Sequence, residues 1–153
     1  MVDALDLVTY CGLHCDLCGS RARIPMRATA LRDAMVEAGW PFWGGAVPGF
    51  TAFWKFLEGL RESGGCPGCR AGGGYSACRI RACARERAVD LCVDCLDFPC
   101  EHINALALRY PTLVADNRRL QAVGLARWLE EQRERVRRGV VYADFRYDLD
   151  ADE

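Results

Sequence analysis

The stretch YCGLHCDLCGS, residues 10–20, carries three cysteines at the spacing C-x3-C-x2-C, namely Cys11, Cys15 and Cys18. This spacing can hold an iron–sulfur cluster or half of a zinc site, and enzymes that cleave S-adenosylmethionine carry it at their radical-generating cluster. Those enzymes need most of a large α/β barrel around the cluster, and a helical-looking chain of 153 residues without alternating strands and helices cannot supply one. We therefore expect a metal centre of another kind.

The whole chain has ten cysteines, and their interpretation depends on the cellular compartment in which the protein resides. No run of about 18 apolar residues could span a bilayer, and the first residues do not form a signal peptide. We therefore expect a cytoplasmic protein with no membrane role. In a reducing cytoplasm, cysteines are more often metal ligands or redox centres than disulfides. All ten are candidate metal ligands: Cys11, Cys15, Cys18, Cys66, Cys69, Cys78, Cys83, Cys92, Cys95 and Cys100.

Three C-x2-C pairs carry the strongest metal signal, because a tight turn over two residues can aim both sulfurs at one ion. A structural zinc site takes four ligands, so ten cysteines fill two sites and leave two over. We expect Cys66 and Cys69 to share one zinc ion and Cys15 and Cys18 to share another. The remaining ligands of each site stay open, as do His14 and His102. Two further cysteines could instead be small buried hydrophobes because their C-x4-C spacing is looser, namely Cys78 and Cys83.

Arginines surround the middle cysteines, between Arg61 and Arg87. A local excess of positive charge stabilises thiolates and the negative centre that four thiolates form around a metal. The same arginines could contact RNA, but the formal net charge of the whole chain is −1, which argues against nucleic-acid binding.

Apolar periodicity predicts a mainly α-helical protein. Helices are expected over residues 27–38, from Phe50 to the glycines at 64–65, from 78 to 90, from Pro99 to Pro111, and from 111 to 139 with a division at Gly124. The tail alternates apolar and polar residues and predicts an extended strap. We expect one domain over residues 1–153, with a cysteine-rich metal-binding part at 1–102, a helical part at 103–139 and an extended tail at 140–153.

Four motifs in this order resemble the DUF3795 family, a domain of unknown function: YCGLHCDLC, CPGC, CRIRAC and CVDCLDFPC. The resemblance covers residues 10–102, and the chain matches the family pattern at all ten cysteines. It implies a small cysteine-rich protein presumed to bind zinc, with no established activity and no known substrate.

Three functions compete. The first is a zinc-binding protein with two structural cysteine sites, serving as an interaction or ligand-binding module for a protein or small-molecule partner. The second is an iron–sulfur or thiol redox protein. The third is a zinc-dependent enzyme, but the sequence shows no readable catalytic constellation, which favours a non-enzymatic role.

Overall fold

The structure is a computed structural model that describes residues 4–63 and 66–147. The chain divides into two compact units, one from Gly19 to Pro67 and the other made of the residues up to Cys18 together with those from Gly68 onward. In the described residues the only β pairing is an isolated bridge between Val8 and His14. The prediction of a mainly helical protein is confirmed, whereas the predicted division at residues 102 and 139 stays a prediction.

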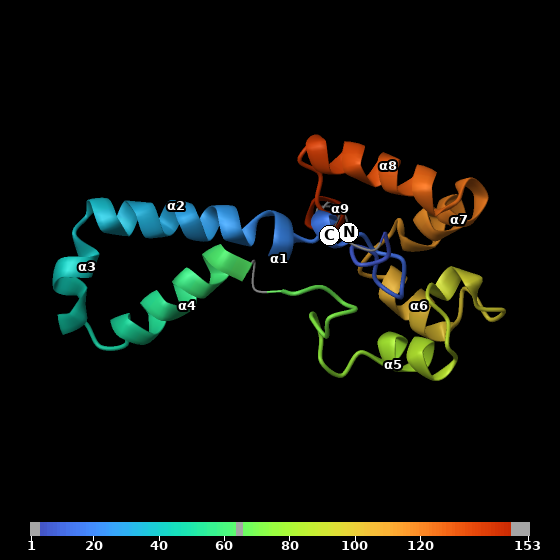
Figure 1. Ribbon diagram of the computed structural model, residues 1–153, viewed down its shortest axis with the longest axis horizontal. Helices are drawn as coiled ribbons and strands as arrows, with labels where there is room; N and C mark the ends of the chain where they lie inside the picture. Colours follow the sequence, from blue (N-terminus) through green and yellow to red (C-terminus); the bar gives the residue numbers. More distant parts are fainter. Residues whose placement is uncertain (1–3, 64–65, 148–153) are drawn as a thin grey trace. The chain divides into compact units, whose positions relative to one another are not determined.

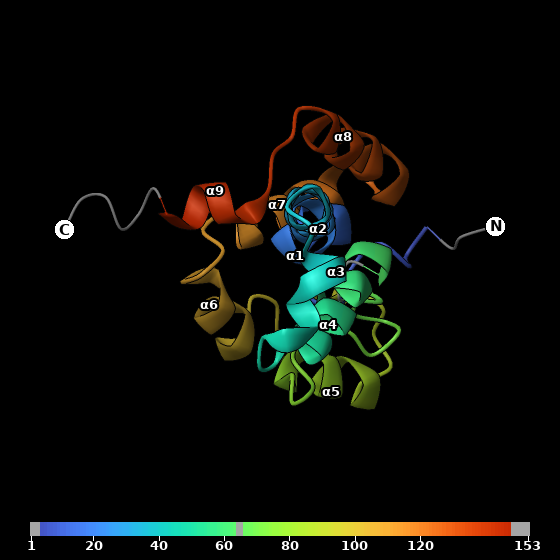
Figure 2. The same cartoon turned by 90° about the vertical axis from the view of Figure 1, so that its left-hand side faces the viewer.

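The unit from Gly19 to Pro67 is a helical hairpin. It consists of α1 (Gly19–Ala22), α2 (Ile24–Glu37), α3 (Trp40–Trp43), a 3-10 turn η2 (Gly44–Ala46) and α4 (Phe50–Ser63). Helices α2 and α4 pack along each other in Figures 1 and 2, and Arg32 of α2 pairs with Glu58 of α4 at 3.1 Å. Pro25 lies in the first turn of α2 as predicted, and Gly39 follows its end with φ +77°.

The other unit holds the remaining elements: 3-10 turns η1 (Cys15–Leu17) and η3 (Cys92–Asp94), and helices α5 (Arg79–Glu86), α6 (Glu101–Ala107), α7 (Leu113–Val123), α8 (Leu125–Arg137) and α9 (Tyr142–Tyr147). Gly124 separates α7 from α8 with φ +79° and ψ 160°, a conformation outside the helix, as the sequence predicts. Ion pairs join these two helices, Arg135 with Asp116 at 3.2 Å and Arg119 with Glu131.

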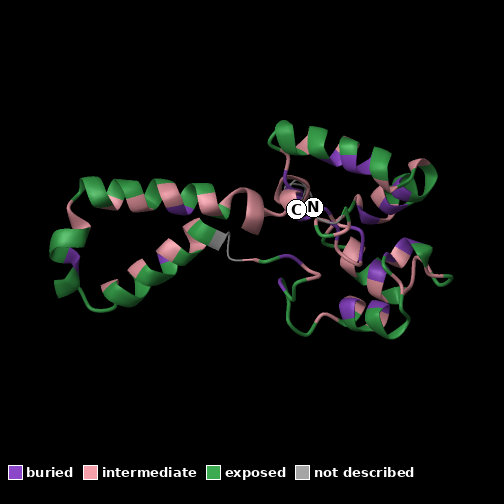
Figure 3. Cartoon of the chain, in the orientation of Figure 1, coloured by how far each residue is buried: buried purple, intermediate pink, exposed green. Residues whose placement is uncertain are grey.

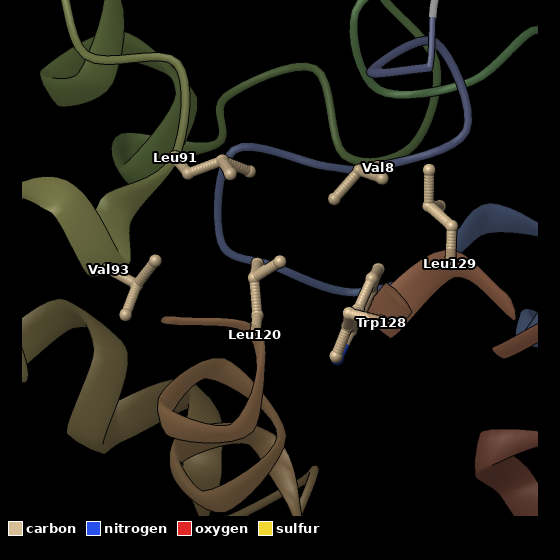
Figure 4. Packing of buried hydrophobic residues seen from close by; sticks show 6 residues of the cluster. All are labelled: Val8, Leu91, Val93, Leu120, Trp128 and Leu129. Carbon is tan, nitrogen blue, oxygen red and sulfur yellow. The ribbon is translucent and has the colours of Figure 1, made fainter. Parts of the chain in front are cut away.

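The core of this unit gathers residues that lie far apart in sequence. Figure 4 shows its six buried side chains close together: Val8, Leu91, Val93, Leu120, Trp128 and Leu129. Trp128 of α8 is fully buried. Figure 3 shows buried segments along α8, whose other residues are mostly exposed. The N-terminal segment that leads into the first cysteine turn thereby packs against α7 and α8 through apolar burial.

The prediction of an extended strap is wrong for residues 142–147, which form α9. The alternation VVYADF also places Val141, Tyr142 and Phe145 on one helical face, since they are spaced three and four residues apart. Asp144 accepts a hydrogen bond from the Val141 amide at 3.1 Å, which favours a helical start. The rest of the predicted tail lies outside the described residues.

None of the helices in the described part of the chain combines the length and the apolar character needed to cross a membrane.

Candidate metal centre

Four thiols line one pocket of about 210 Å³ in the unit that contains α5 and α6: Cys83, Cys92, Cys95 and Cys100. The same pocket is bordered by apolar side chains and by a few charged or polar ones, namely Arg87, Asp97, Glu101 and His102. A concave space with four sulfur donors is a suitable place for a thiophilic metal.

Three separate elements bring these thiols together. Cys83 lies on α5, Cys92 and Cys95 lie at the two ends of the turn η3, and Cys100 precedes the first residue of α6. The backbone oxygen of Cys100 accepts the first helical hydrogen bond, from the Asn104 amide at 2.9 Å. The backbone positions of these four cysteines are therefore set by a helix, a turn and a helix start, which are all defined by local hydrogen bonds.

The turn between Cys92 and Cys95 has the geometry expected of a C-x2-C pair. The amide of Cys95 donates to the Cys92 oxygen at 3.0 Å, and Cys95 itself is extended, with φ −76° and ψ 138°. The pair Cys15 and Cys18 forms the same turn, with an amide-to-oxygen distance of 3.0 Å and φ −79°, ψ 131° at Cys18. Two of the three C-x2-C pairs thus share one backbone conformation.

One arginine contacts the thiol pocket directly. Nη1 of Arg87 lies 3.4 Å from Sγ of Cys95, and the same nitrogen donates to the Asp97 carboxylate. These hydrogen bonds, to Asp97 first and Cys95 second, raise the pKa of Arg87 above its ordinary range. The guanidinium therefore supplies positive charge beside the sulfur of Cys95.

The pKa of the Cys92 thiol lies above its ordinary value. Burial first, and then the nearby thiols of Cys11, Cys100, Cys83 and Cys95, together raise its pKa to about 12. Without a counter-charge, several thiolates cannot coexist here, because each one raises the pKa of the next. A metal cation would remove that obstacle.

Three further cysteines form a second group in the same unit. Cys11 is 9% exposed and its sulfur lies 3.0 Å from the Thr9 hydroxyl. Burial first, with a smaller contribution from the thiols of Cys69 and Cys78, raises the pKa of Cys11 to about 11, although hydrogen bonds with Thr9 and Leu13 oppose the rise. Cys11 also packs beside Cys92 and Cys100 around buried Ile103 and Leu113, so it lies between the two groups.

The other predicted ligands are Cys15, Cys18 and Cys66, and none of them lines the four-thiol pocket. Cys15 is buried, Cys18 and Cys66 are partly exposed, and all ten cysteines are free of disulfides. Cys66 belongs to the unit that ends at Pro67, whereas Cys69 belongs to the other. The predicted sharing of one ion by Cys66 and Cys69, and of another by Cys15 and Cys18, stays a prediction.

The two histidines have different surroundings. His14 is 1% exposed, its ring centroid lies 6.1 Å from that of Trp128, and its amide donates to the Tyr142 hydroxyl at 2.8 Å. His102 borders the thiol pocket, and its Nδ1 lies 3.9 Å from the Glu101 carboxylate. His102 is thus the histidine closer to the four-thiol pocket.

Across residues 4–63 and 66–147, no three histidine, cysteine, aspartate or glutamate side chains lie close enough together, as they stand, to hold a single metal ion. The four pocket thiols sit on fixed backbone, and rotation about each Cα–Cβ bond moves a sulfur without moving that backbone. The donor set of four thiols beside a guanidinium fits a thiolate-bound metal.

Sequence reasoning did not single out two features of the pocket. It treated Cys83 as a possible buried hydrophobe, although this thiol lines the pocket, and it named Arg87 only as one of several arginines. The only sequence feature that pointed to Cys83 was its position on a predicted short helix that lies between other cysteines. No C-x2-C spacing identified the cysteines with which it would share a pocket.

Comparison with known proteins places the cysteine region in a family. A family model described as a protein of unknown function, DUF3795, matches residues 7–105. No curated protein and no solved structure matches the chain. The matched range includes all ten cysteines and both histidines.

Proposed function

The chain belongs to the DUF3795 family, and from that premise we propose that it binds a structural zinc ion through Cys83, Cys92, Cys95 and Cys100. The observation that carries the proposal is the convergence of these four thiols on one pocket from α5, η3 and the start of α6. Four cysteine thiolates are a common ligand set for structural zinc, with Zn–S distances of about 2.3 Å.

The proposed role of the metal is to add a strong link between short elements that also share an apolar cluster. Helices α5 and α6 are eight and seven residues long, too short to be stable alone. A metal bound to both would contribute its binding free energy to folding, on the order of 10 kcal/mol in small zinc domains. A site closed by four thiolates has no position for a reactive water, which supports a structural role over hydrolysis.

A second candidate is an iron–sulfur cluster in the same pocket. The specific observation in its favour is the size of the pocket, about 210 Å³, which the four thiols line together with eight other residues. One zinc ion at bonding distance from four sulfurs would require the pocket to contract, whereas a cluster of several iron and sulfide ions needs such room. Four cysteines are also the usual ligands of these clusters, so the metal content decides between the two.

The interaction role expected from the sequence concerns the unit from Gly19 to Pro67. Several large apolar side chains of this unit are exposed, with Phe42 at 95% and Phe56 at 66%. Exposed aromatic residues on a small helical hairpin support a contact surface for a protein or small molecule. The identity of that partner stays a prediction.

The test is the metal content of protein purified with and without oxygen, combined with its visible spectrum. Zinc with no visible absorption supports the structural site, and iron with sulfide and a brown colour supports the cluster. Cys95→Ser should lose the metal held by this pocket. Ala82→Ser, which adds the same hydroxyl at an exposed position beside Cys83, should keep it. Full metal retention by folded Cys95→Ser would overturn the proposal.

A further inference from the structure

We infer that the tip of the helical hairpin, residues 38–56, docks on the surface of a lipid bilayer, which rests on the interaction role proposed above for this unit and names its partner. The expectation of no membrane role came from the lack of a spanning segment, and docking on a membrane surface needs no such segment. The cysteines of the four-thiol pocket lie elsewhere in the chain, at residues 83–100.

The hairpin tip exposes large apolar side chains. Helix α3 and the start of α4 lie at the opposite end of this unit from α1 in Figure 1, and Figure 3 shows most of their residues as exposed. Phe42 is 95% exposed and Phe56 is 66% exposed, while Trp43 and Phe53 are 45% and 41% exposed. Water therefore contacts four aromatic side chains of one short segment, which is more than scattered surface residues account for.

Charge is nearly absent from the hairpin tip. Residues 38–54 carry no charged side chain, and Lys55 is the only charged residue between positions 38 and 56. The ion pair between Arg32 and Glu58 lies further along α2 and α4, outside the tip. Because transfer of a charged group out of water is costly, the tip can enter the apolar part of a membrane interface more easily than the rest of the hairpin.

The backbone of the tip satisfies many of its own polar groups. Amides that donate to oxygens within the tip are those of Phe42 and Trp43, to Gly39 at 2.9 and 3.3 Å, and that of Val47, to Gly44 at 2.8 Å. The indole Nε1 of Trp43 donates to the oxygen of Ala38 at 3.1 Å, and Pro41 and Pro48 have no amide proton. Since an unpaired backbone group is costly in lipid, these internal hydrogen bonds favour a segment that can leave water.

Stacked aromatic rings give the tip a fixed shape. The ring centroids of Trp40 and Trp43 lie 4.2 Å apart, those of Trp40 and Phe50 5.6 Å, and those of Phe50 and Trp54 5.4 Å. These rings join α3 to the first turns of α4, so the exposed Phe42 is presented by a preformed structure and little ordering is needed on binding. Tryptophan is also the residue type that is enriched where a membrane meets water.

The exposure and the charge of the tip favour lipid over a protein or a small molecule. Binding sites for small molecules are concave, whereas Phe42 projects with nearly all of its surface open. A fluid lipid layer can surround a projecting side chain without a preformed pocket. Exposed Lys55 can extend its ammonium group to lipid phosphates while its stem stays on apolar surface. Residues 19–67 carry six basic and four acidic side chains, so anionic lipid should strengthen the contact.

The experiment measures co-sedimentation of the full-length protein with phosphatidylcholine vesicles, prepared with and without phosphatidylglycerol. Wild type should bind both, and salt should remove only the gain that phosphatidylglycerol adds. Phe42→Gln should weaken binding to both by about 10- to 100-fold, which is the contribution expected from burial of one phenylalanine. Leu108→Gln, at a residue of the other unit that is 82% exposed, is the matched control and should bind like wild type.

The other outcomes each overturn the lipid assignment. They are no vesicle binding by wild type, equal binding by Phe42→Gln, and binding that salt abolishes completely, which would rest on charge alone. If neither protein binds vesicles and wild type forms a dimer that Phe42→Gln does not form, the tip is an interface between copies of the chain, and the interaction role stands without lipid. The metal content of the same samples tests the four-thiol site separately, since Phe42→Gln should leave it unchanged.

Tryptophan fluorescence of wild type guards against a variant that fails to fold. Three of the four tryptophans lie in the tip, and the fourth, Trp128, is fully buried. Vesicles should shift the emission to shorter wavelength, and phosphatidylcholine brominated on its acyl chains should quench most of it. Emission that stays unchanged in protein that sediments with the vesicles would contradict insertion of the tip.

Discussion

A Cβ atom placed on Gly12 would lie 2.1 Å from Oδ1 of Asn117. Gly12 adopts φ +86°, and fully buried Asn117 of α7 donates to the oxygen of Cys11 at 2.9 Å and to that of Leu113 at 2.9 Å. The amide side chain of Asn117 thus holds the first cysteine turn against α7. Only glycine at position 12 leaves room for this side chain. This contact fixes the backbone position of Cys11 against α7.

Gly12→Ala should destabilise the protein by about 2–5 kcal/mol, because a left-handed backbone strains alanine and the new methyl meets Asn117. Urea unfolding followed by circular dichroism measures the loss. Gly139→Ala is the matched control, since Gly139 has φ +73° with nothing within 4 Å of a Cβ. It should cost only about 1–2 kcal/mol. Equal losses would show that the Asn117 contact contributes nothing.

Asn117→Ala should cost about 1–3 kcal/mol, because two buried carbonyl oxygens lose their donor. In the double variant Gly12→Ala/Asn117→Ala, the space left by Asn117 accommodates the new methyl. The two losses should therefore sum to more than the loss in the double variant, by about 0.5–3 kcal/mol. Strict additivity in the same urea experiment contradicts the contact.

Tyr142→Phe tests a pH dependence. Burial raises the pKa of Tyr142 well above its usual range, so the folded state keeps a proton that the unfolded state releases near pH 10. The contribution of Tyr142 to stability is therefore complete below about pH 10 and falls as the pH rises further. Thermal unfolding from pH 8 to 11 should show a steeper loss in wild type than in Tyr142→Phe.

The phenylalanine variant also loses the acceptor for the His14 amide, which lowers stability at every pH. Tyr75→Phe, at a residue that is 75% exposed, is the control and should follow wild type across the whole range. Parallel curves for wild type and Tyr142→Phe would argue against a titrating Tyr142.

Arg87→Gln should weaken metal retention by about 10- to 100-fold, because a side chain that contacts a ligand and adjusts its charge typically contributes that much. Competition with a chromophoric chelator measures the change. Arg87→Lys should recover part of the affinity, since it restores the charge without the planar guanidinium. Arg79→Gln removes the same charge from the opposite end of α5 and should leave metal retention unchanged. An equal loss in Arg79→Gln would show that the lower net charge, and not the contact of Arg87 with Cys95, weakens metal binding.

Local features of the fold could be predicted from the sequence where one residue determines the backbone. Pro25 and Gly39 bracket α2, and Gly124 divides the last helical region, because each restricts or frees φ within one turn. The tail could not be assigned, since a six-residue segment satisfies both the strand period and the helix period, and packing decides between them.

Some features of the candidate site could likewise be predicted from the sequence, and others could not. The turn from Cys92 to Cys95 is local, so its C-x2-C spacing predicts it. The position of Cys83 at the same pocket depends on how α5 packs near α6. The spacing of the cysteines in the sequence does not predict that packing. The arginines beside the middle cysteines were expected to stabilise thiolates as a group. In the structure Arg87 contacts a sulfur, whereas Arg70 and Arg81 bind carbonyl oxygens.

The most direct test of the metal centre is a crystal of the full chain, purified without oxygen and measured on both sides of the zinc and iron absorption edges. We expect an anomalous peak between Cys83, Cys92, Cys95 and Cys100, either one zinc at about 2.3 Å from all four sulfurs or the iron ions of a cluster. The account would be contradicted if these four sulfurs bound nothing, or if they formed disulfides, in protein that carries its metal elsewhere.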